Sequence, residues 1–160
     1  SHNAILFLRM ERFLFFVLLF NVCICSVVVY VDYFNDSKGT NVGSTIAALK
    51  GLGRTIEGRI WLLAGGEGKG QDFAELAEFC QNYVAEVLAY GRDADSIMTG
   101  VADSCLASKW QTIDDALVYA RQHAQKNDVV LLSPACASFD QFKNYVARGE
   151  YFVAQVEALQ

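Results

Sequence analysis

The sequence is poor in proline, in histidine and in blocks of basic residues. One proline and two histidines occur among 160 residues. Acidic residues outnumber basic ones by 18 to 13, which gives a formal net charge of −5. Because binding to a phosphate backbone requires a basic face, this composition argues against nucleic acid as a partner. The single proline and the lack of low-complexity tracts leave no segment that resembles a linker.

Paired cysteine motifs are also missing. The five cysteines are an odd number, and no two of them form a C-x-x-C pair. With only two histidines in addition, the sequence predicts neither a zinc site nor a disulfide framework. We therefore expect no metal site, reduced thiols and a cytoplasmic protein. The five positions are Cys23, Cys25, Cys80, Cys105 and Cys136.

Hydrophobic residues make up 53% of the chain, which is enough for one domain with a substantial core. Short apolar runs of strand length alternate with segments of helical periodicity. This order predicts an α/β domain with a mostly parallel sheet and helices on both faces. The predicted strands are residues 27–34, 59–64, 84–90 and 128–133. The predicted helices are residues 42–52, 72–80 and 112–124, a short one after Arg92, and two within 141–159 with a break at Gly149.

The N-terminal region contains a long apolar run, FLFFVLLFNVCICSVVVYV, at residues 13–31. Its length and the charged residues before it are typical of a membrane or signal segment. If residues 27–34 form a strand, however, too few residues remain for a helix that needs about 20 to span a bilayer. A buried strand, a hairpin or sequence foreign to the domain explains the run equally well. Because the first residue is Ser, we expect the chain to be a fragment of a longer protein.

Three predicted strands end in loops of unusual composition: NDSKGT (35–40), AGGEGKG (64–70) and SPACASFDQF (133–142). In a parallel sheet all three loops lie on one edge, where open α/β sheets bind their ligands. In the first loop Lys38 offers a positive charge, Asp36 can accept hydrogen bonds from sugar hydroxyls, and Thr40 can donate a hydroxyl or cap a helix. The alternative is a solvated turn with a capping residue.

The second loop is not a complete phosphate loop. The pattern G-x-x-x-x-G-K-[ST] fails because Leu63 stands where the first glycine belongs and Gly70 follows Lys69. Its glycines still allow backbone N–H groups and Lys69 to approach an anion. In the third loop we interpret Ser138 as a hydrogen-bond donor and Cys136 as a packing residue, because no histidine is expected nearby to activate a thiol.

Four stretches together carry a family resemblance. The sequences NDSKGTNVGST, LLAGGEGKGQDF, AYGRDADSI and VVLLSPACASFDQFKNYVARGEYF resemble the C-terminal domain of the Mur ligases, with a Rossmann-like fold. The stretch LSPACASFDQFKNY is most similar to the members that add D-glutamate to UDP-N-acetylmuramoyl-L-alanine in peptidoglycan synthesis. The resemblance covers residues 31–160, whereas residues 1–30 do not share it.

The resemblance implies a function and a set of site residues. In the family, ATP with Mg²⁺ phosphorylates the carboxylate of the nucleotide-sugar substrate, and the amine of D-glutamate attacks the acyl phosphate. The C-terminal domain supplies D-glutamate and closes over ATP held by a central domain. By motif position, Asp36 lies near the ribose of ATP. The residues expected around D-glutamate are Lys38, Thr40, Lys69, Ser138, Phe139 and Tyr145.

Two departures concern the apolar wall of this site. Phe139 stands where the family can have an aliphatic residue, and Tyr145 stands where Phe is familiar. We expect the isolated chain to be inactive, because the phosphate loop and metal ligands of the family belong to the central domain. The alternative to a ligase fragment is a membrane-tethered or stand-alone anion-binding α/β module without catalysis.

Overall fold

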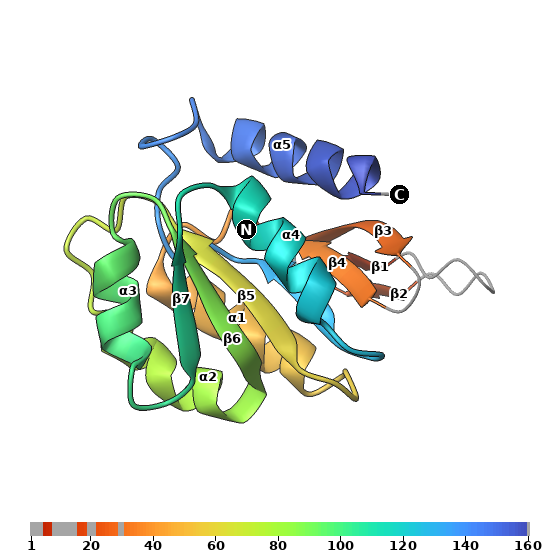
Figure 1. Cartoon of the computed structure of the whole chain (residues 1–160), viewed down its shortest axis with the longest axis horizontal. Coiled ribbons are helices and arrows are strands. Elements are labelled where there is room, and N and C mark those ends of the chain that lie inside the picture. The colour runs from red at the N-terminus through yellow and green to blue at the C-terminus, as the bar shows by residue number, and fades with distance from the viewer. Residues whose placement is uncertain (1–4, 8–15, 19–21, 29–30, 160) are drawn as a thin grey trace.

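The computed structural model describes residues 5–7, 16–18, 22–28 and 31–159. Its helices cover both faces of one sheet in an α/β arrangement (Figure 1). The strands are β1 (Ile5–Phe7), β2 (Phe16–Leu18), β3 (Val22–Val28), β4 (Val31–Asn35), β5 (Ile60–Gly65), β6 (Val84–Tyr90), β7 (Leu106–Trp110) and β8 (Val129–Leu132). The helices are α1 (Val42–Gly53), the 3₁₀ helix η1 (Phe73–Leu76), α2 (Ala77–Tyr83), α3 (Ala94–Val101), α4 (Ile113–His123) and α5 (Tyr145–Ala158).

The described strands form one sheet in the order β2-β1-β3-β4-β8-β5-β6-β7. Strands β4, β8, β5, β6 and β7 are parallel to one another. Strand β3 runs antiparallel to β4, and β1 is parallel to β3 but antiparallel to β2. The predicted fold, a mostly parallel sheet within an α/β domain, is therefore confirmed.

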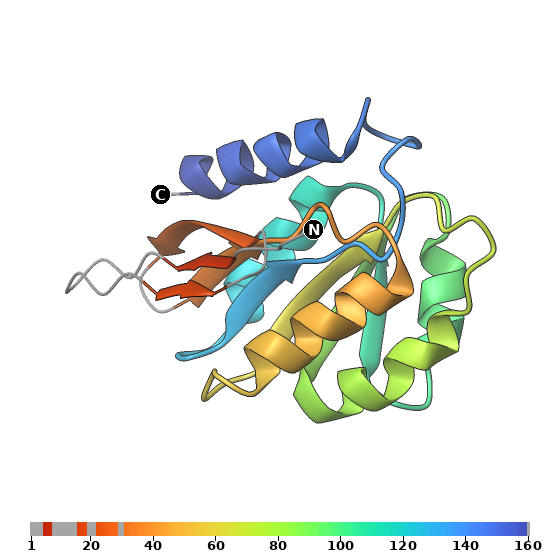
Figure 2. The ribbon, with the colours of Figure 1, turned by 180° about the vertical axis from the view of Figure 1, so that it is seen from behind.

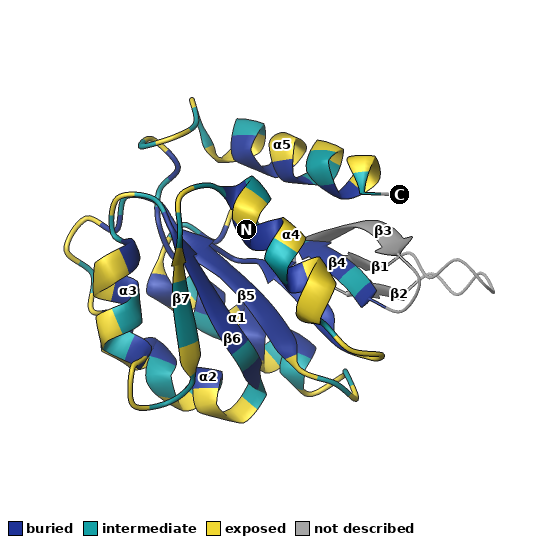
Figure 3. Cartoon of the chain, in the orientation of Figure 1, coloured by how far each residue is buried: buried dark blue, intermediate teal, exposed yellow. Residues whose placement is uncertain are grey.

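The sheet separates two apolar layers. On one face, α1, α2 and α3 pack against alternate strand residues such as Leu62 (Figure 2). On the other face, α4 and α5 pack against the neighbouring residues Trp61 and Leu63. All six residues of β5 are buried, and the outer helix surfaces are exposed (Figure 3). Burial on both faces explains why the central strands are continuous apolar runs rather than alternating patterns.

Polar side chains cap the starts of the helices. Asp72 accepts a hydrogen bond from the N–H of Ala74, and Thr112 accepts one from the N–H of Asp115. Both residues are the first of a helix range predicted from the sequence, 72–80 and 112–124. At the start of α1, just after the first polar loop, Asn41 accepts a hydrogen bond from the N–H of Ser44. At the start of α5, two residues after the third polar loop, Asn144 accepts one from the N–H of Ala147. Such caps satisfy otherwise unpaired N–H groups and stabilise a helix by about 1 kcal/mol each.

Two predictions about the elements are wrong, and one strand was not predicted. The predicted strand 27–34 is the end of β3 and most of β4, which pair antiparallel with Val28 opposite Val31. The apolar run contains no residue that signals such a reversal. Strand β7 was not predicted, because LASKW lies at the sheet edge, where its residues are exposed or half-buried and form no apolar run.

The predicted break at Gly149 is absent, and α5 continues through this residue. A Cβ atom at Gly149 would lie 3.0 Å from Asn35 Nδ2 and 3.2 Å from Ser37 Cβ. Glycine at position 149 therefore allows α5 to pack closely against the first loop, and it does not end the helix.

The apolar run at residues 13–31 is partly described. Its described segments belong to β2, β3 and the start of β4, whereas residues 13–15, 19–21 and 29–30 lie outside the described residues. The described segments are strands, which agrees with one of the alternatives left open by the sequence. Within the described ranges, no helix has the length and apolar character needed to cross a bilayer. The domain boundary at residues 30 and 31 stays a prediction.

Candidate functional site at the carboxyl edge of the sheet

The three polar loops follow three neighbouring parallel strands. The first loop (residues 35–40) follows β4, the third loop (133–142) follows β8, and the second loop (64–70) includes the end of β5. Strand β8 pairs with β4 on one side and β5 on the other. All three loops therefore leave the sheet at the same carboxyl edge, where ligands bind in open α/β folds.

The second and third loops are joined by backbone pairing. The N–H of Glu67 donates to the carbonyl of Ala137 at 2.8 Å, and the N–H of Ala137 donates back to Glu67 at 3.0 Å. Gly66 makes this approach feasible, because its φ is +126° and a Cβ would lie 2.2 Å from the Ala137 oxygen. Only glycine adopts this conformation at so short a distance without strain.

The side chain of Gln71 connects the same loops to helix α1. Its Oε1 accepts a hydrogen bond from the N–H of Val42 at 2.8 Å. Its Nε2 donates to the carbonyls of Gly68 at 2.9 Å and Ala135 at 3.0 Å. One amide group thus satisfies buried backbone groups from three segments, which sets their relative positions. Nothing in the sequence around Gln71 distinguished it from a surface residue.

Arg148, on α5, joins the first and third loops. Its side chain is fully buried. Nε donates to Ser37 Oγ at 2.9 Å, Nη2 donates to the Ser37 carbonyl at 2.8 Å, and Nη1 donates to the Cys136 carbonyl at 3.0 Å. Ser37 Oγ in turn donates to the carbonyl of Tyr145 at 2.7 Å. Sequence reasoning missed Arg148, because charged residues in amphipathic helices are normally exposed.

Asp36 is enclosed between the first loop and the end of β8. Its Oδ2 accepts a hydrogen bond from Ser133 Oγ at 2.8 Å. Burial raises the pKa of Asp36 to about 6, and the Ser133 hydroxyl and the charges of Arg148 and Lys38 oppose this rise. The carboxyl group therefore titrates close to the physiological range.

The two predicted lysines are both exposed at this edge. Lys69 adopts a positive φ of 54°, and its Nζ lies 5.6 Å from the centroid of the Phe139 ring. This cation–π contact brings together two predicted site residues from different loops. Lys38 lies next to the buried Ser37 in the first loop, and its carbonyl accepts a hydrogen bond from the N–H of Thr40 at 2.8 Å.

The remaining predicted residues lie in or directly after the third loop. Ser138 is buried, and its carbonyl accepts hydrogen bonds from the N–H groups of Gln141 and Phe142. Phe139 and Tyr145 are exposed, with 62% and 42% of their surface accessible. Tyr145 begins α5 and is tied to the first loop through its own carbonyl. The roles of these residues toward a ligand stay predictions.

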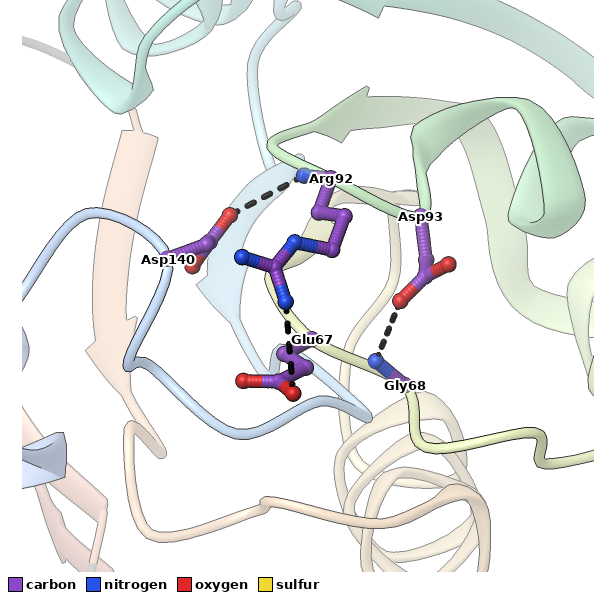
Figure 4. A network of polar contacts seen from close by, with 5 residues as sticks. All are labelled: Glu67, Gly68, Arg92, Asp93 and Asp140. Carbon is purple, nitrogen blue, oxygen red and sulfur yellow. Dashed lines mark hydrogen bonds and ion pairs between the residues drawn. The ribbon is translucent and has the colours of Figure 1, made fainter.

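A polar network positions the second loop from the side of β6 (Figure 4). The N–H of Gly68, directly before Lys69, donates to Asp93 Oδ2 at 2.6 Å. The N–H of Arg92 donates to Asp140 Oδ2 at 3.0 Å, and its guanidinium lies 3.3 Å from Glu67. The side chain of Arg92 is exposed, so this ion pair adds little stability. Through Arg92, the turn after β6 contacts both the second loop at Glu67 and the third loop at Asp140.

Cys136 was interpreted as a packing residue, and its burial agrees with this interpretation. Cys136 is fully buried, and burial raises the pKa of its thiol to about 12, which is unsuitable for a nucleophile. His123 is exposed at the end of α4, where its ring lies 4.0 Å from that of Tyr119. The thiols of Cys80, Cys105 and Cys136 are free. Within the described residues, no three His, Cys, Asp or Glu side chains cluster closely enough to hold a metal ion.

The geometry defines an α/β domain with two cations and several hydroxyl groups at one sheet edge, the arrangement expected for binding an anion. Comparison with known proteins gives the family. Residues 25–136 match the Mur ligase, glutamate ligase domain. The chain belongs to this family.

Curated relatives carry a more specific name. The chain is 50% identical over 132 residues to the UDP-N-acetylmuramoylalanine--D-glutamate ligase of Acinetobacter baylyi, with 81% of this chain and 30% of the relative covered. It is 48% identical over 129 residues to the protein of that name from Pseudomonas fluorescens, with 81% and 29% covered. The chain thus spans about 30% of the length of these relatives.

Solved structures support the fold. A domain from a putative UDP-N-acetylmuramate:L-alanyl-gamma-D-glutamyl-medo-diaminopimelate ligase of Haemophilus ducreyi matches with a TM-score of 0.56. The match covers 82% of this chain and 95% of that domain, at 16% sequence identity. At this identity the likeness concerns the fold alone.

The bridge between the second and third loops gives a stability prediction. Gly66→Ala should lower the free energy of unfolding by about 2 kcal/mol or more, because the added Cβ meets the Ala137 carbonyl. Urea unfolding measures this change. Gly70→Ala is the matched control, since Gly70 also has a positive φ, of +75°, but has no atom within 4 Å of the built Cβ. Equal losses in both variants would contradict a tight bridge.

The enclosed Asp36 predicts a pH-dependent stability. The folded-state pKa of about 6 lies above the ordinary value of 3.8. The folded state therefore binds more protons between these values, and this contribution to stability is lost as the pH rises through 6. Relative to the native chain, Asp36→Asn should become more stable from pH 4 to pH 7, by on the order of 2 kcal/mol.

Urea unfolding at each pH measures this difference. The exposed residue Asp103 provides the control variant Asp103→Asn, for which no comparable trend is expected. A difference between Asp36→Asn and the native chain that does not change with pH would show that Asp36 is not enclosed.

Proposed function

We propose that this chain is the D-glutamate-binding domain of an ATP-dependent ligase that adds D-glutamate to UDP-N-acetylmuramoyl-L-alanine in peptidoglycan synthesis. The observation that carries the proposal is the gathering of the Lys38 loop, the Lys69 loop and the Ser138 loop at one sheet edge. The names of the relatives at about 50% identity support the same substrate. Since the free thiols suit a reducing compartment, we expect a cytoplasmic location.

The charges at the edge fit a small dicarboxylate. D-glutamate carries two carboxylate groups, and Lys38 and Lys69 are exposed cations on adjoining loops. Ser138 and Thr40 would donate hydroxyl hydrogen bonds to the carboxylates, and charge-assisted bonds of this kind are the stronger ones. Phe139, which already contacts Lys69, and Tyr145 would form the apolar wall of the site. The bound amine is then held in one orientation for attack on an acyl phosphate.

ATP would contact this domain through Asp36. Its carboxylate sits at the first loop with Oδ2 bonded to Ser133, and it can accept a hydrogen bond from a ribose hydroxyl. The 160 residues contain no G-x-x-x-x-G-K-[ST] sequence. We therefore propose that the phosphates of ATP and Mg²⁺ are held by other parts of the ligase, while this domain closes over the nucleotide.

The 160-residue chain alone should bind D-glutamate but form no amide bond. Calorimetry is expected to give heat of binding for D-glutamate, with L-glutamate as the stereochemical control. Phosphate release from ATP with UDP-N-acetylmuramoyl-L-alanine should remain at background, since no phosphate loop polarises ATP. Ligation by the isolated chain, free of other enzyme, would contradict the proposal, and so would equal binding of both glutamate enantiomers.

Lys69 should contribute directly to D-glutamate affinity. We consider a chimera in which residues 31–159 replace the matching segment of the Acinetobacter baylyi relative. In this chimera, Lys69→Ala should raise KM for D-glutamate and lower kcat/KM about tenfold or more, because a charge-assisted hydrogen bond of roughly 1.5–3 kcal/mol is lost.

Lys126→Ala is the control for the Lys69 experiment. Lys126 is also exposed but lies between α4 and β8, at the amino end of the strand. Kinetic constants for D-glutamate that are unaffected by Lys69→Ala would show that Lys69 is a solvated loop residue.

A further inference from the structure

The guanidinium of Arg148 is buried, and its charge acts on the Asp36 carboxyl without forming an ion pair with it. The residue has no accessible surface, and its three hydrogen bonds all go to neutral oxygens of Ser37 and Cys136. No ion pair between Arg148 and a carboxylate occurs in the part of the chain that the structure describes. Burying a charge that has no ion-pair partner is unfavourable. The hydrogen bonds that the guanidinium donates to two different loops therefore point to a role in holding these loops.

We propose that Arg148 is a positioning residue that sets the spacing of Lys38 and Ser138 for D-glutamate. This inference rests on the function proposed above. Arg148 itself does not touch the ligand, because its side chain lies fully below the surface. It acts through the backbone of the two loops that carry the ligand-binding side chains.

The bonding pattern shows how this control works on the first loop. Arg148 donates to the carbonyl of Ser37, and this carbonyl belongs to the peptide unit that continues into Lys38. The orientation of that peptide plane therefore determines the direction in which Lys38 leaves the loop. The bond from Nε to Ser37 Oγ holds the same residue at a second point.

The third loop is held by the other arm of the same planar group. Nη1 of Arg148 donates to the carbonyl of Cys136, two residues before Ser138. Because the guanidinium is rigid and planar, the Ser37 and Cys136 carbonyls are fixed at one separation. Lys cannot replace this function, since a single ammonium on a flexible stem does not reproduce the fork.

Helix α5 provides the support for Arg148. Asn35 Nδ2 donates to the carbonyl of Gly149 at 3.1 Å, and Ser37 Oγ donates to the carbonyl of Tyr145 at 2.7 Å. The helix is therefore attached to the first loop on both sides of Arg148. This attachment places the guanidinium at a defined depth below the carboxyl edge.

The test uses the active chimera described above and two variants. Arg148→Lys keeps the positive charge but loses the fork. Ser37→Ala keeps Arg148 but removes the hydroxyl that accepts from Nε and donates to Tyr145. We expect KM for D-glutamate to rise about tenfold in Arg148→Lys and several-fold in Ser37→Ala.

Asp128→Asn is the matched structural control. Asp128 is also buried, and its carboxylate accepts hydrogen bonds from Arg59 N, Trp61 Nε1 and Gln125 N. It precedes β8 and therefore lies at the opposite, amino edge of the sheet. This variant should lose stability without a change in KM for D-glutamate, which separates positioning from general destabilisation.

The outcomes distinguish the inference from the proposed function. If the native chimera is active but Arg148→Lys and Ser37→Ala leave KM for D-glutamate unchanged, Arg148 has no positioning function. If Arg148→Lys does not fold, the KM of Ser37→Ala for D-glutamate alone tests the inference. A rise in KM in Asp128→Asn equal to that in Ser37→Ala would also overturn the inference. A native chimera that shows no saturation by D-glutamate overturns the proposed function itself.

Discussion

The parallel pairing of β8 with both β4 and β5 is the constraint on which the arrangement of the molecule depends. It brings strands that are far apart in the chain into adjacent positions, and it places their loops at one edge. Backbone groups in those loops are then enclosed and must find partners. The bridge between Glu67 and Ala137, the amide of Gln71 and the guanidinium of Arg148 supply these partners.

Much of the fold could be predicted, because the central strands are buried on both faces and are therefore continuous apolar runs. Residues 59–64 and 84–90 were predicted as strands, and the structure has β5 and β6 there. The helix starts at Asp72 and Thr112 could also be predicted, because capping depends on residues that are close in sequence. The grouping of the three loops followed from the parallel order of the strands, which does not require knowledge of any side-chain contact.

The residues that hold the loops together were beyond sequence reasoning. Arg148 and Gln71 are ordinary surface residue types, and only tertiary packing buries one of them and connects the other to three segments. Asp93 directly precedes α3, but its carboxylate accepts a hydrogen bond from Gly68 in another loop and does not cap the helix. Periodicity and spacing record local structure. Gly68 lies 25 residues from Asp93, and Ser37 lies 111 residues from Arg148.

The distance in sequence between Arg148 and Ser37, 111 residues, has a consequence for folding. The first loop follows β4, yet the side chain that fixes it lies on α5, so the loop cannot reach its final conformation before nearly all of the described chain is present. Contacts of such long range close large loops and slow folding. During synthesis at the ribosome, the sheet is therefore completed only after β8 and α5 have been made. The carboxyl edge of the sheet is expected to be the last part of the domain to form.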